Sequence, residues 1–159
     1  MTLSQPLLRS LCLLLLATFS LTSIATERGT SRQAKRMLEN AIYVVQEKGA
    51  EEAFAKFNDL HGGFVQNDLY IFAIDMKGVY KASGANPKLV GQSLAEVSDA
   101  AGKPIGKEIL KLADRMGYGI IEYDWLNRQT NDIEHKFSRV QKVGDYVLGV
   151  GFYLPEETN

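Results

Sequence analysis

Cysteine is nearly absent from this chain of 159 residues, and the single copy, Cys12, lies in an apolar segment near the start. Without that segment the chain would contain no thiol, which excludes disulfides, thiolate catalysis and cysteine-ligated zinc. Histidine is also scarce: only His61 and His135 occur, and neither belongs to a pattern such as H-x-x-H or H-E-x-x-H. These absences predict a protein that has no metal site and needs no cofactor.

The signatures of several enzyme classes and of nucleic-acid binding are missing as well. The chain has no G-x-S-x-G motif, no P-loop and no G-x-G-x-x-G context. Glu122 and Asp124 could form a carboxylate pair, but alternation places them opposite the apolar and aromatic residues of their strand, so we expect them to face solvent. The net charge is -1 and no basic block occurs, which argues against nucleic acid. We therefore predict that the protein is not an enzyme.

The only long apolar run lies in residues 1–25. Arg9 is its single charge, and Ser23 and Ala25 place small residues just before Thr26. This arrangement is typical of a secretory signal peptide that is cleaved before Thr26. An uncleaved membrane anchor stays open, although a span needs about 20 apolar residues and polar residues interrupt this run. We expect a secreted, mature chain that forms one domain.

Hydrophobic periodicity in residues 26–159 predicts an α+β domain. The expected helices are Ser31–Lys48, Ala50–Phe57, Ser93–Val97 and Pro104–Met116. The expected strands are Leu69–Asp75, Val79–Ser83, Gly119–Trp125, Ile133–Lys142 and Tyr146–Tyr153, with residues 58–67 as a loop. Two strands, then helices, then three strands indicate a single antiparallel sheet. The apolar stripe of the first helix could pack on this sheet or on another helix, and we favour the protein's own sheet.

Three groups of residues in this pattern are candidates for a structural, binding or catalytic role. Asp75 stands at the turn between the first two strands, where we expect its carboxylate to cap the turn rather than to act in catalysis. On the first strand Tyr70 and Phe72 share a face, either as core or as the wall of a ligand pocket. The last three strands contribute an aromatic pair, a cation, a hydroxyl and a floor of glycines: Tyr123, Trp125, Lys136, Ser138, Gly149 and Gly151.

An aromatic wall, a cation and a hydroxyl suit a pocket for a small anion. A buried carboxylate loses its water shell and needs a charged partner, which Lys136 could supply, while Tyr123 or Ser138 could add a hydrogen bond. Trp125 and Tyr70 could exclude water. The other interpretation stays open: the aromatic residues belong to the core, and Lys136 lies on the surface and covers the sheet edge.

Five stretches of the chain together resemble a known family. They read YIFAIDMKGVYKASGANPKLVGQSL, DAAGKPI, GYGIIEYDW, HKFSRV and GDYVLGVGFY. In this order they resemble the single Cache domain, in its second subtype, over residues 34–153. The resemblance implies a PAS-like fold, with a long N-terminal helix, a five-stranded antiparallel sheet and crossover helices over the pocket face. It also implies an extracytoplasmic sensor, usually the periplasmic part of a chemoreceptor or sensor kinase, that binds small organic molecules such as short carboxylates.

The family's site residues can be placed on this chain position by position. Its Y-x-W pair corresponds to Tyr123 and Trp125, its lysine to Lys136, and its strand-one aromatics to Tyr70 and Phe72. In two further places the chain departs from the family pattern. Arg139 stands where the family has a tyrosine, and Ser83 where a histidine is frequent. We expect Arg139 to be exposed because it alternates with Lys136.

Two functions of different class remain. The first is a periplasmic ligand-binding sensor module that acts in signal transduction, as in chemotaxis. Because no output domain precedes Asn159, its signal would pass through a separate partner, such as a membrane-bound receptor or kinase. The second is a non-catalytic interaction or structural protein whose pocket is occluded. It would work through the helix Ser31–Lys48, which could also form a homodimer.

Overall fold

The computed structural model describes residues 27–154, so the predicted signal peptide lies outside the described residues. In chain order its elements are α2 (Ser31–Lys48), α3 (Ala50–Asn58), β1 (Val65–Gln66), β2 (Leu69–Asp75), β3 (Tyr80–Ser83), η1 (Pro87–Leu89), α4 (Ile105–Met116), β4 (Tyr118–Asn127), β5 (Asp132–Val143) and β6 (Tyr146–Tyr153). The α+β class and the order of the main elements are as the sequence predicts.

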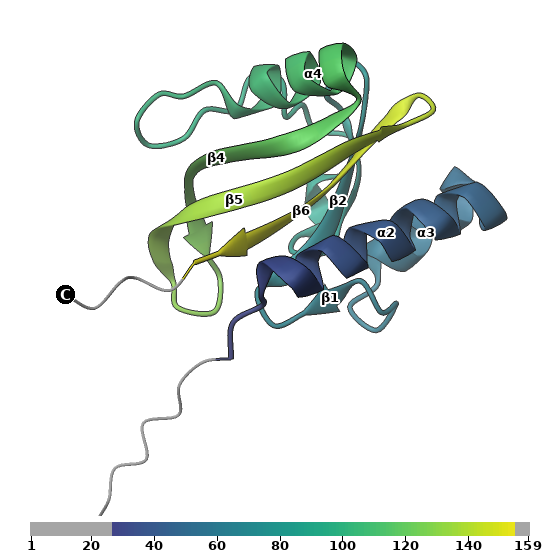
Figure 1. Ribbon diagram of the computed structural model, residues 1–159, viewed down its shortest axis with the longest axis horizontal. Helices are drawn as coiled ribbons and strands as arrows, with labels where there is room; N and C mark the ends of the chain where they lie inside the picture. The colour runs from purple at the N-terminus through teal and green to yellow at the C-terminus, as the bar shows by residue number, and fades with distance from the viewer. Residues whose placement is uncertain (1–26, 155–159) are drawn as a thin grey trace, which may run out of the picture.

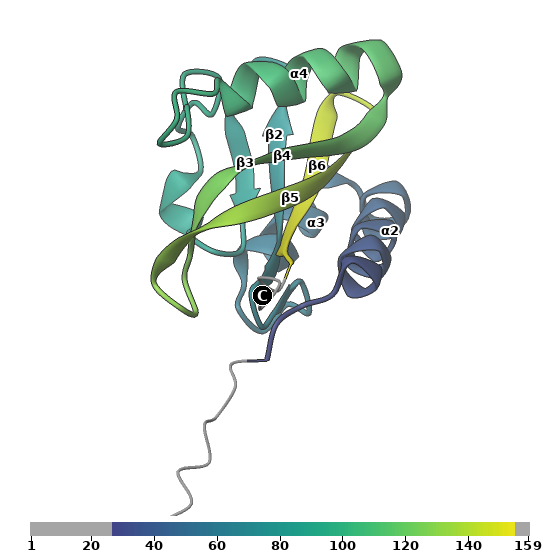
Figure 2. The ribbon, with the colours of Figure 1, turned by 60° about the vertical axis from the view of Figure 1, so that its left-hand side comes forward.

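One antiparallel sheet forms the centre of the domain (Figures 1 and 2). Its strands follow the order β1-β2-β6-β5-β4, and β3 also pairs with β2, beside β1. The sheet has six strands where the sequence predicts five. The additional strand is β1, only two residues long, in the segment that we expected to be a loop.

The helices α2 and α3 cover one face of the sheet (Figure 2). Thr30 and Gln33 start α2 through a capping box, in which each side chain accepts a hydrogen bond from the other residue's backbone N–H. The apolar stripe of α2 then packs against Ile71, Leu148 and Val150 of the central strands. The prediction that this stripe packs on the protein's own sheet is confirmed.

The opposite face of the sheet lies under α4 and the segment that leads to it (Figure 1). Ile105 and Ile109 of α4 are almost fully buried there, against Phe72 of β2 and Ile121 of β4. Because side chains alternate along a strand, Tyr70, Phe72 and Ile74 all point to this second face. The sheet therefore separates a face packed by α2 and α3 from a face on which α4 and the segment before it leave room for a cavity.

The prediction of a short helix at Ser93–Val97 is wrong. The segment forms a bridge between Ser93 and Val79, and the backbone N–H of Leu94 donates to the carbonyl of Gly78. A five-residue helix is costly to nucleate, whereas these contacts with the β2–β3 turn satisfy the same backbone groups. As a result, Leu94 is buried on the second face of the sheet.

Asp75 caps the β2–β3 turn, as predicted. Its Oδ1 accepts hydrogen bonds from the N–H groups of Lys77 at 2.9 Å and Val79 at 3.0 Å. Its Oδ2 lies 3.0 Å from Nζ of Lys81. Burial alone would raise the pKa of Asp75, but the bonds to Val79, Lys81 and Lys77 outweigh it and lower this pKa.

We predict that Asp75→Ala lowers the free energy of unfolding by about 1–3 kcal/mol, because two backbone donors lose their acceptor. Asp75→Asn keeps an acceptor oxygen and should cost less. A folded-state pKa below the unfolded one stabilises the protein above about pH 4, and this contribution disappears as the pH falls through the folded-state value. Urea denaturation from pH 7 to pH 3 should therefore show a shrinking difference between the wild type and Asp75→Asn. A constant difference would contradict this role of the charge.

Candidate ligand-binding site

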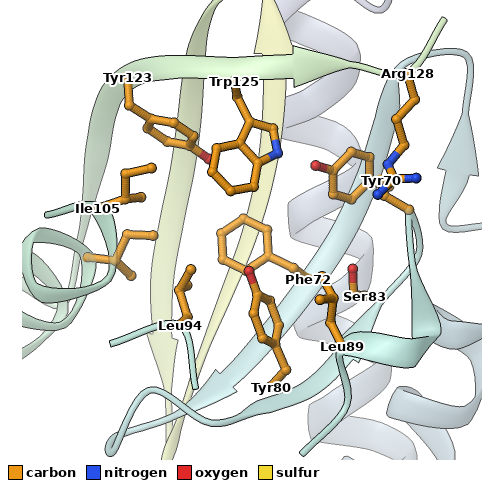
Figure 3. Close-up of a pocket in the computed structure, with 12 residues that line it drawn as sticks. Tyr70, Phe72, Tyr80, Ser83, Leu89, Leu94, Ile105, Tyr123, Trp125 and Arg128 are labelled. Carbon is orange, nitrogen blue, oxygen red and sulfur yellow. The ribbon is translucent and has the colours of Figure 1, made fainter. Parts of the chain in front are cut away.

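A cavity lies on the second face of the sheet, between β2, β3, β4 and the segment from Leu89 to Ile109 (Figure 3). The cavity has a volume of about 50 Å³, and one water molecule needs roughly 10–15 Å³ of such space. The lining residues are Tyr70, Phe72, Tyr80, Ser83, Ala85, Leu89, Leu94, Ile105, Ile109, Tyr123, Trp125 and Arg128. This space can hold a few water molecules or a small organic group.

Four of the six residues predicted for the site line this cavity: Tyr70, Phe72, Tyr123 and Trp125. Tyr123 and Trp125 come from β4, and their rings meet edge to face with centroids 5.8 Å apart. The other two predicted residues, Lys136 and Ser138, do not line the cavity, although β5 places them directly opposite Tyr123 and Ile121 of β4. Lys136 is hydrogen-bonded to Tyr70 and Ser138 to Tyr123, and both of these tyrosines line the cavity.

Lys136 is a buried cation, with only 1% of its surface exposed. Its Nζ donates a hydrogen bond of 2.8 Å to the hydroxyl of Tyr70. The same ammonium lies 4.3 Å from the ring centre of Tyr70 and 4.9 Å from that of Tyr153. Within residues 27–154 no carboxylate forms an ion pair with it. The interpretation of Lys136 as a surface residue at the sheet edge is therefore wrong.

The hydrogen bond from Lys136 orients the hydroxyl of Tyr70. Because the oxygen accepts from the ammonium, its own O–H is free to donate elsewhere. Tyr70 lines the cavity, so this polarised O–H can donate a hydrogen bond to an acceptor inside the cavity. The charge of Lys136 can thus act on the cavity through Tyr70 without a direct contact.

Tyr123 has a similar partner behind it, since its hydroxyl lies 2.8 Å from Oγ of Ser138, which is fully buried. Burial, and secondarily the neighbouring Tyr70, raise the pKa of Tyr123 and of Tyr80 above the usual tyrosine range. Both side chains therefore stay neutral at physiological pH. No Asp or Glu lines the cavity. The polar groups that face it favour an anion or a neutral acceptor over a cation.

The two glycines of β6 leave room for the protein's own side chains. A Cβ at Gly151 would overlap Cε of Lys136, and a Cβ at Gly149 would overlap the ring of Phe72. We expected these glycines to let another group approach the backbone, and the groups that approach it are the side chains of Phe72 and Lys136. Gly151 is what allows Lys136 to lie flat against the sheet beneath Tyr70.

Sequence reasoning missed several lining residues. Tyr80, Leu94 and Ile105 reach the cavity from segments whose spacing gives no local sign of a shared site. Arg128 follows the end of β4, and in the view of Figure 3 its guanidinium lies near Tyr70 at one end of the cavity. It forms no ion pair with the described residues. A cation at the end of a strand that already carries Y-x-W is a signal that could have pointed to it.

The first face of the sheet, beyond α2, holds the remaining charged candidates. Glu122 and Asp124 lie there, as expected, and bind the two ring nitrogens of His135 at 3.0 Å and 3.1 Å. The expectation that Arg139 is exposed is wrong: it is partly buried, donates to the hydroxyl of Ser31 at 3.0 Å and lies over the ring of Phe152. None of these side chains reaches the cavity.

We predict that Gly151→Ala destabilises the fold by about 1–3 kcal/mol, because the new methyl group displaces Lys136. Lys136→Ala removes the clashing atoms, so the double variant should lose less stability than the sum of the two single changes. Gly149→Ala is the matched control, since its clash is with Phe72 and should not be relieved by Lys136→Ala. Chemical denaturation of the variants measures these differences. If the losses of stability in Gly151→Ala and Lys136→Ala simply add up in the double variant, the contact between Gly151 and Lys136 is contradicted.

The model of the family described as Single Cache domain 2 matches residues 23–157. No curated protein matches the chain. Within residues 27–154, no helix combines the length and apolar character that a membrane crossing requires.

Among solved structures, similar folds occur in chemotaxis proteins. A methyl-accepting chemotaxis protein from Vibrio parahaemolyticus RIMD 2210633 has a TM-score of 0.65 and 18% identity, covering 77% of this chain and 86% of that one. A Cache chemosensory domain described for carboxylic acid recognition has a TM-score of 0.61 and 24% identity, covering 78% and 88%. The periplasmic sensor domain of a chemotaxis protein has a TM-score of 0.60 and 20% identity, covering 78% and 90%.

These structural similarities establish the PAS-like Cache fold, and the family model covers most of the sequence. The chain belongs to the Single Cache domain 2 family, whose members are extracytoplasmic sensory domains that bind ligands.

Proposed function

We propose that this domain binds a short carboxylate in the periplasm and passes the bound state to a separate partner, such as a membrane-bound receptor or kinase. The observation that carries the proposal is the buried ammonium of Lys136, which has no carboxylate partner among the described residues. An uncompensated buried charge costs several kcal/mol. A hydrogen bond and two aromatic rings offset part of this cost, and an anion in the cavity would offset more.

The rest of the cavity suits the hydrocarbon part of such a ligand. Phe72, Leu94 and Ile109 are apolar and at least nine-tenths buried. They would remove the short chain of an acid from water, while Tyr70 donates to its carboxylate. The small volume favours ligands of few heavy atoms. The carboxylic acid recognition reported for one similar Cache domain agrees with this class.

The proposed location and signalling route rest on the sequence. A signal peptide cleaved before Thr26 would deliver residues 26–159 to the periplasm. The family's role in chemoreceptors and sensor kinases supports a partner of that kind.

The second candidate is a non-catalytic interaction protein with an occluded cavity. The observation that favours it is the small volume of about 50 Å³. Such a protein would act through another surface, such as the outer side of α2, where Tyr43 is 60% exposed. That side could also form a homodimer. The two candidates differ in one measurable property, which is whether a small ligand stabilises the fold.

We predict that residues 26–159 are stabilised by one or more short carboxylic acids in a thermal-shift screen. A ligand at 100 times its Kd adds about 2.7 kcal/mol, which is a Tm increase of several degrees for a domain of this size. Lys136→Met keeps the bulk of the side chain and removes the charge, so it should weaken binding by about 10-fold to 100-fold. Trp125→Ala should also weaken binding, because it opens the wall of the cavity.

Lys111→Met is the matched control, since Lys111 is exposed on α4, away from the cavity. Wild-type affinity in Lys136→Met would show that the charge of Lys136 does not contribute to binding. If no acid raises the Tm of a cooperatively folded wild type, carboxylate binding is contradicted and the second candidate, an interaction protein with an occluded cavity, is supported.

A further inference from the structure

Tyr80 is the one tyrosine of the cavity whose hydroxyl has no partner within residues 27–154. Tyr70 is bound to Lys136 and Tyr123 to Ser138, but no hydrogen bond involves the side chain of Tyr80. Only 8% of Tyr80 is exposed, and it belongs to the cavity lining. The buried side-chain atoms without a partner in the described residues belong to Asp68 and Arg139, so the hydroxyl of Tyr80 is not sealed off and keeps access to the cavity. A hydroxyl that has no protein partner and faces a cavity is available to whatever occupies it, whether water or a ligand.

The position of Tyr80 gives it a different role from that of Tyr70, which would donate to the carboxylate of the ligand. In Figure 3, Tyr70, Ser83 and Arg128 lie at one end of the cavity, whereas the hydroxyl of Tyr80 points toward its middle, beside Leu94. β3 places Tyr80 opposite Ile74 and Ser83 opposite Phe72, so the two hydroxyls come from different parts of the strand. A ligand whose carboxylate lies near Tyr70 would present its carbon chain, not its carboxylate, to Tyr80.

The hydroxyl of Tyr80 penalises a purely hydrocarbon chain. The cavity is large enough for water, which can pair with the hydroxyl when no ligand is bound. A methylene group that displaces this water leaves the hydroxyl unpaired, which lowers affinity. An oxygen on the chain instead accepts the hydrogen bond. Burial raises the pKa of Tyr80, so the hydroxyl remains protonated and available as a donor.

We propose that the ligand is a short carboxylate with a second oxygen on its chain, an oxo or hydroxy acid, and that Tyr80 donates a hydrogen bond to this oxygen. The proposal rests on the carboxylate-binding function proposed above and narrows it to one chemical class. Tyr80 is then the residue that distinguishes these acids from fatty acids of the same length. Selection of this kind is strong, because a site built to bond an oxygen rejects the analogue that lacks it.

The test compares acids that share a carbon skeleton. Kd values of pyruvate, lactate and propionate, and of 2-oxobutyrate and butyrate, are measured by calorimetry on the wild type and on Tyr80→Phe. The wild type should bind at least one oxygenated acid about 10-fold more tightly than its plain counterpart. Tyr80→Phe should remove this preference by weakening the oxygenated acid, while the Kd of the plain acid stays the same or decreases.

Two further measurements make the test specific. Tyr80→Phe breaks no hydrogen bond to a described residue, so the Tm without ligand should not fall, which separates a lost contact from a damaged fold. Tyr43→Phe removes the same hydroxyl from an exposed site on α2 and should change neither Tm nor Kd.

The possible failures are distinguishable. If the wild type binds plain and oxygenated acids equally well, the function stands and the role of Tyr80 is overturned. The same holds if the preference survives in Tyr80→Phe, or if this variant weakens both acids equally. If the wild type binds no acid, the carboxylate function itself fails, and the inference fails with it.

Discussion

The buried ammonium of Lys136 is the constraint on which the site depends. Its charge is held on the sheet by one hydrogen bond and two aromatic rings, without a carboxylate among the described residues. Such an arrangement is tolerable only if the surroundings are well packed and polarisable, which explains why tyrosines rather than leucines surround it. Tyr70, Tyr153 and Gly151 all contact the side chain of Lys136, and Tyr70 connects the buried charge to the cavity.

The alternation of strand residues lets one sheet serve two purposes. On β2, Ile71 faces the helices that hold the fold together, while Tyr70 and Phe72 face the cavity. The residues on the face of Ile71 stabilise the fold through contacts with α2 and α3, and the residues on the face of Tyr70 and Phe72 can be specialised for a ligand. Residues on the cavity face can therefore change with little effect on the packing of the helix face.

The sequence predicts the fold well because its signals are local and repeated. The capped, striped helix Ser31–Lys48 and the strand Leu69–Asp75 have the bounds that periodicity predicts. The segment Ser93–Val97 was predicted wrongly because tertiary hydrogen bonds to Gly78 and Val79 decide its conformation. For the site, alternation and the Y-x-W resemblance pointed to Tyr123 and Trp125. Nothing local indicated Tyr80, because its role depends on which hydroxyl groups find partners after folding.

The overlap between Gly151 and Lys136 has a consequence for the history of this domain. A relative that has a smaller residue at position 136 has more room for a side chain at position 151, whereas one that retains the lysine would have to move the end of that side chain away. The two positions should therefore covary among descendants of a common ancestor. A loss of the glycine would mark lineages in which the buried cation has been abandoned, and with it the anion that it would recruit.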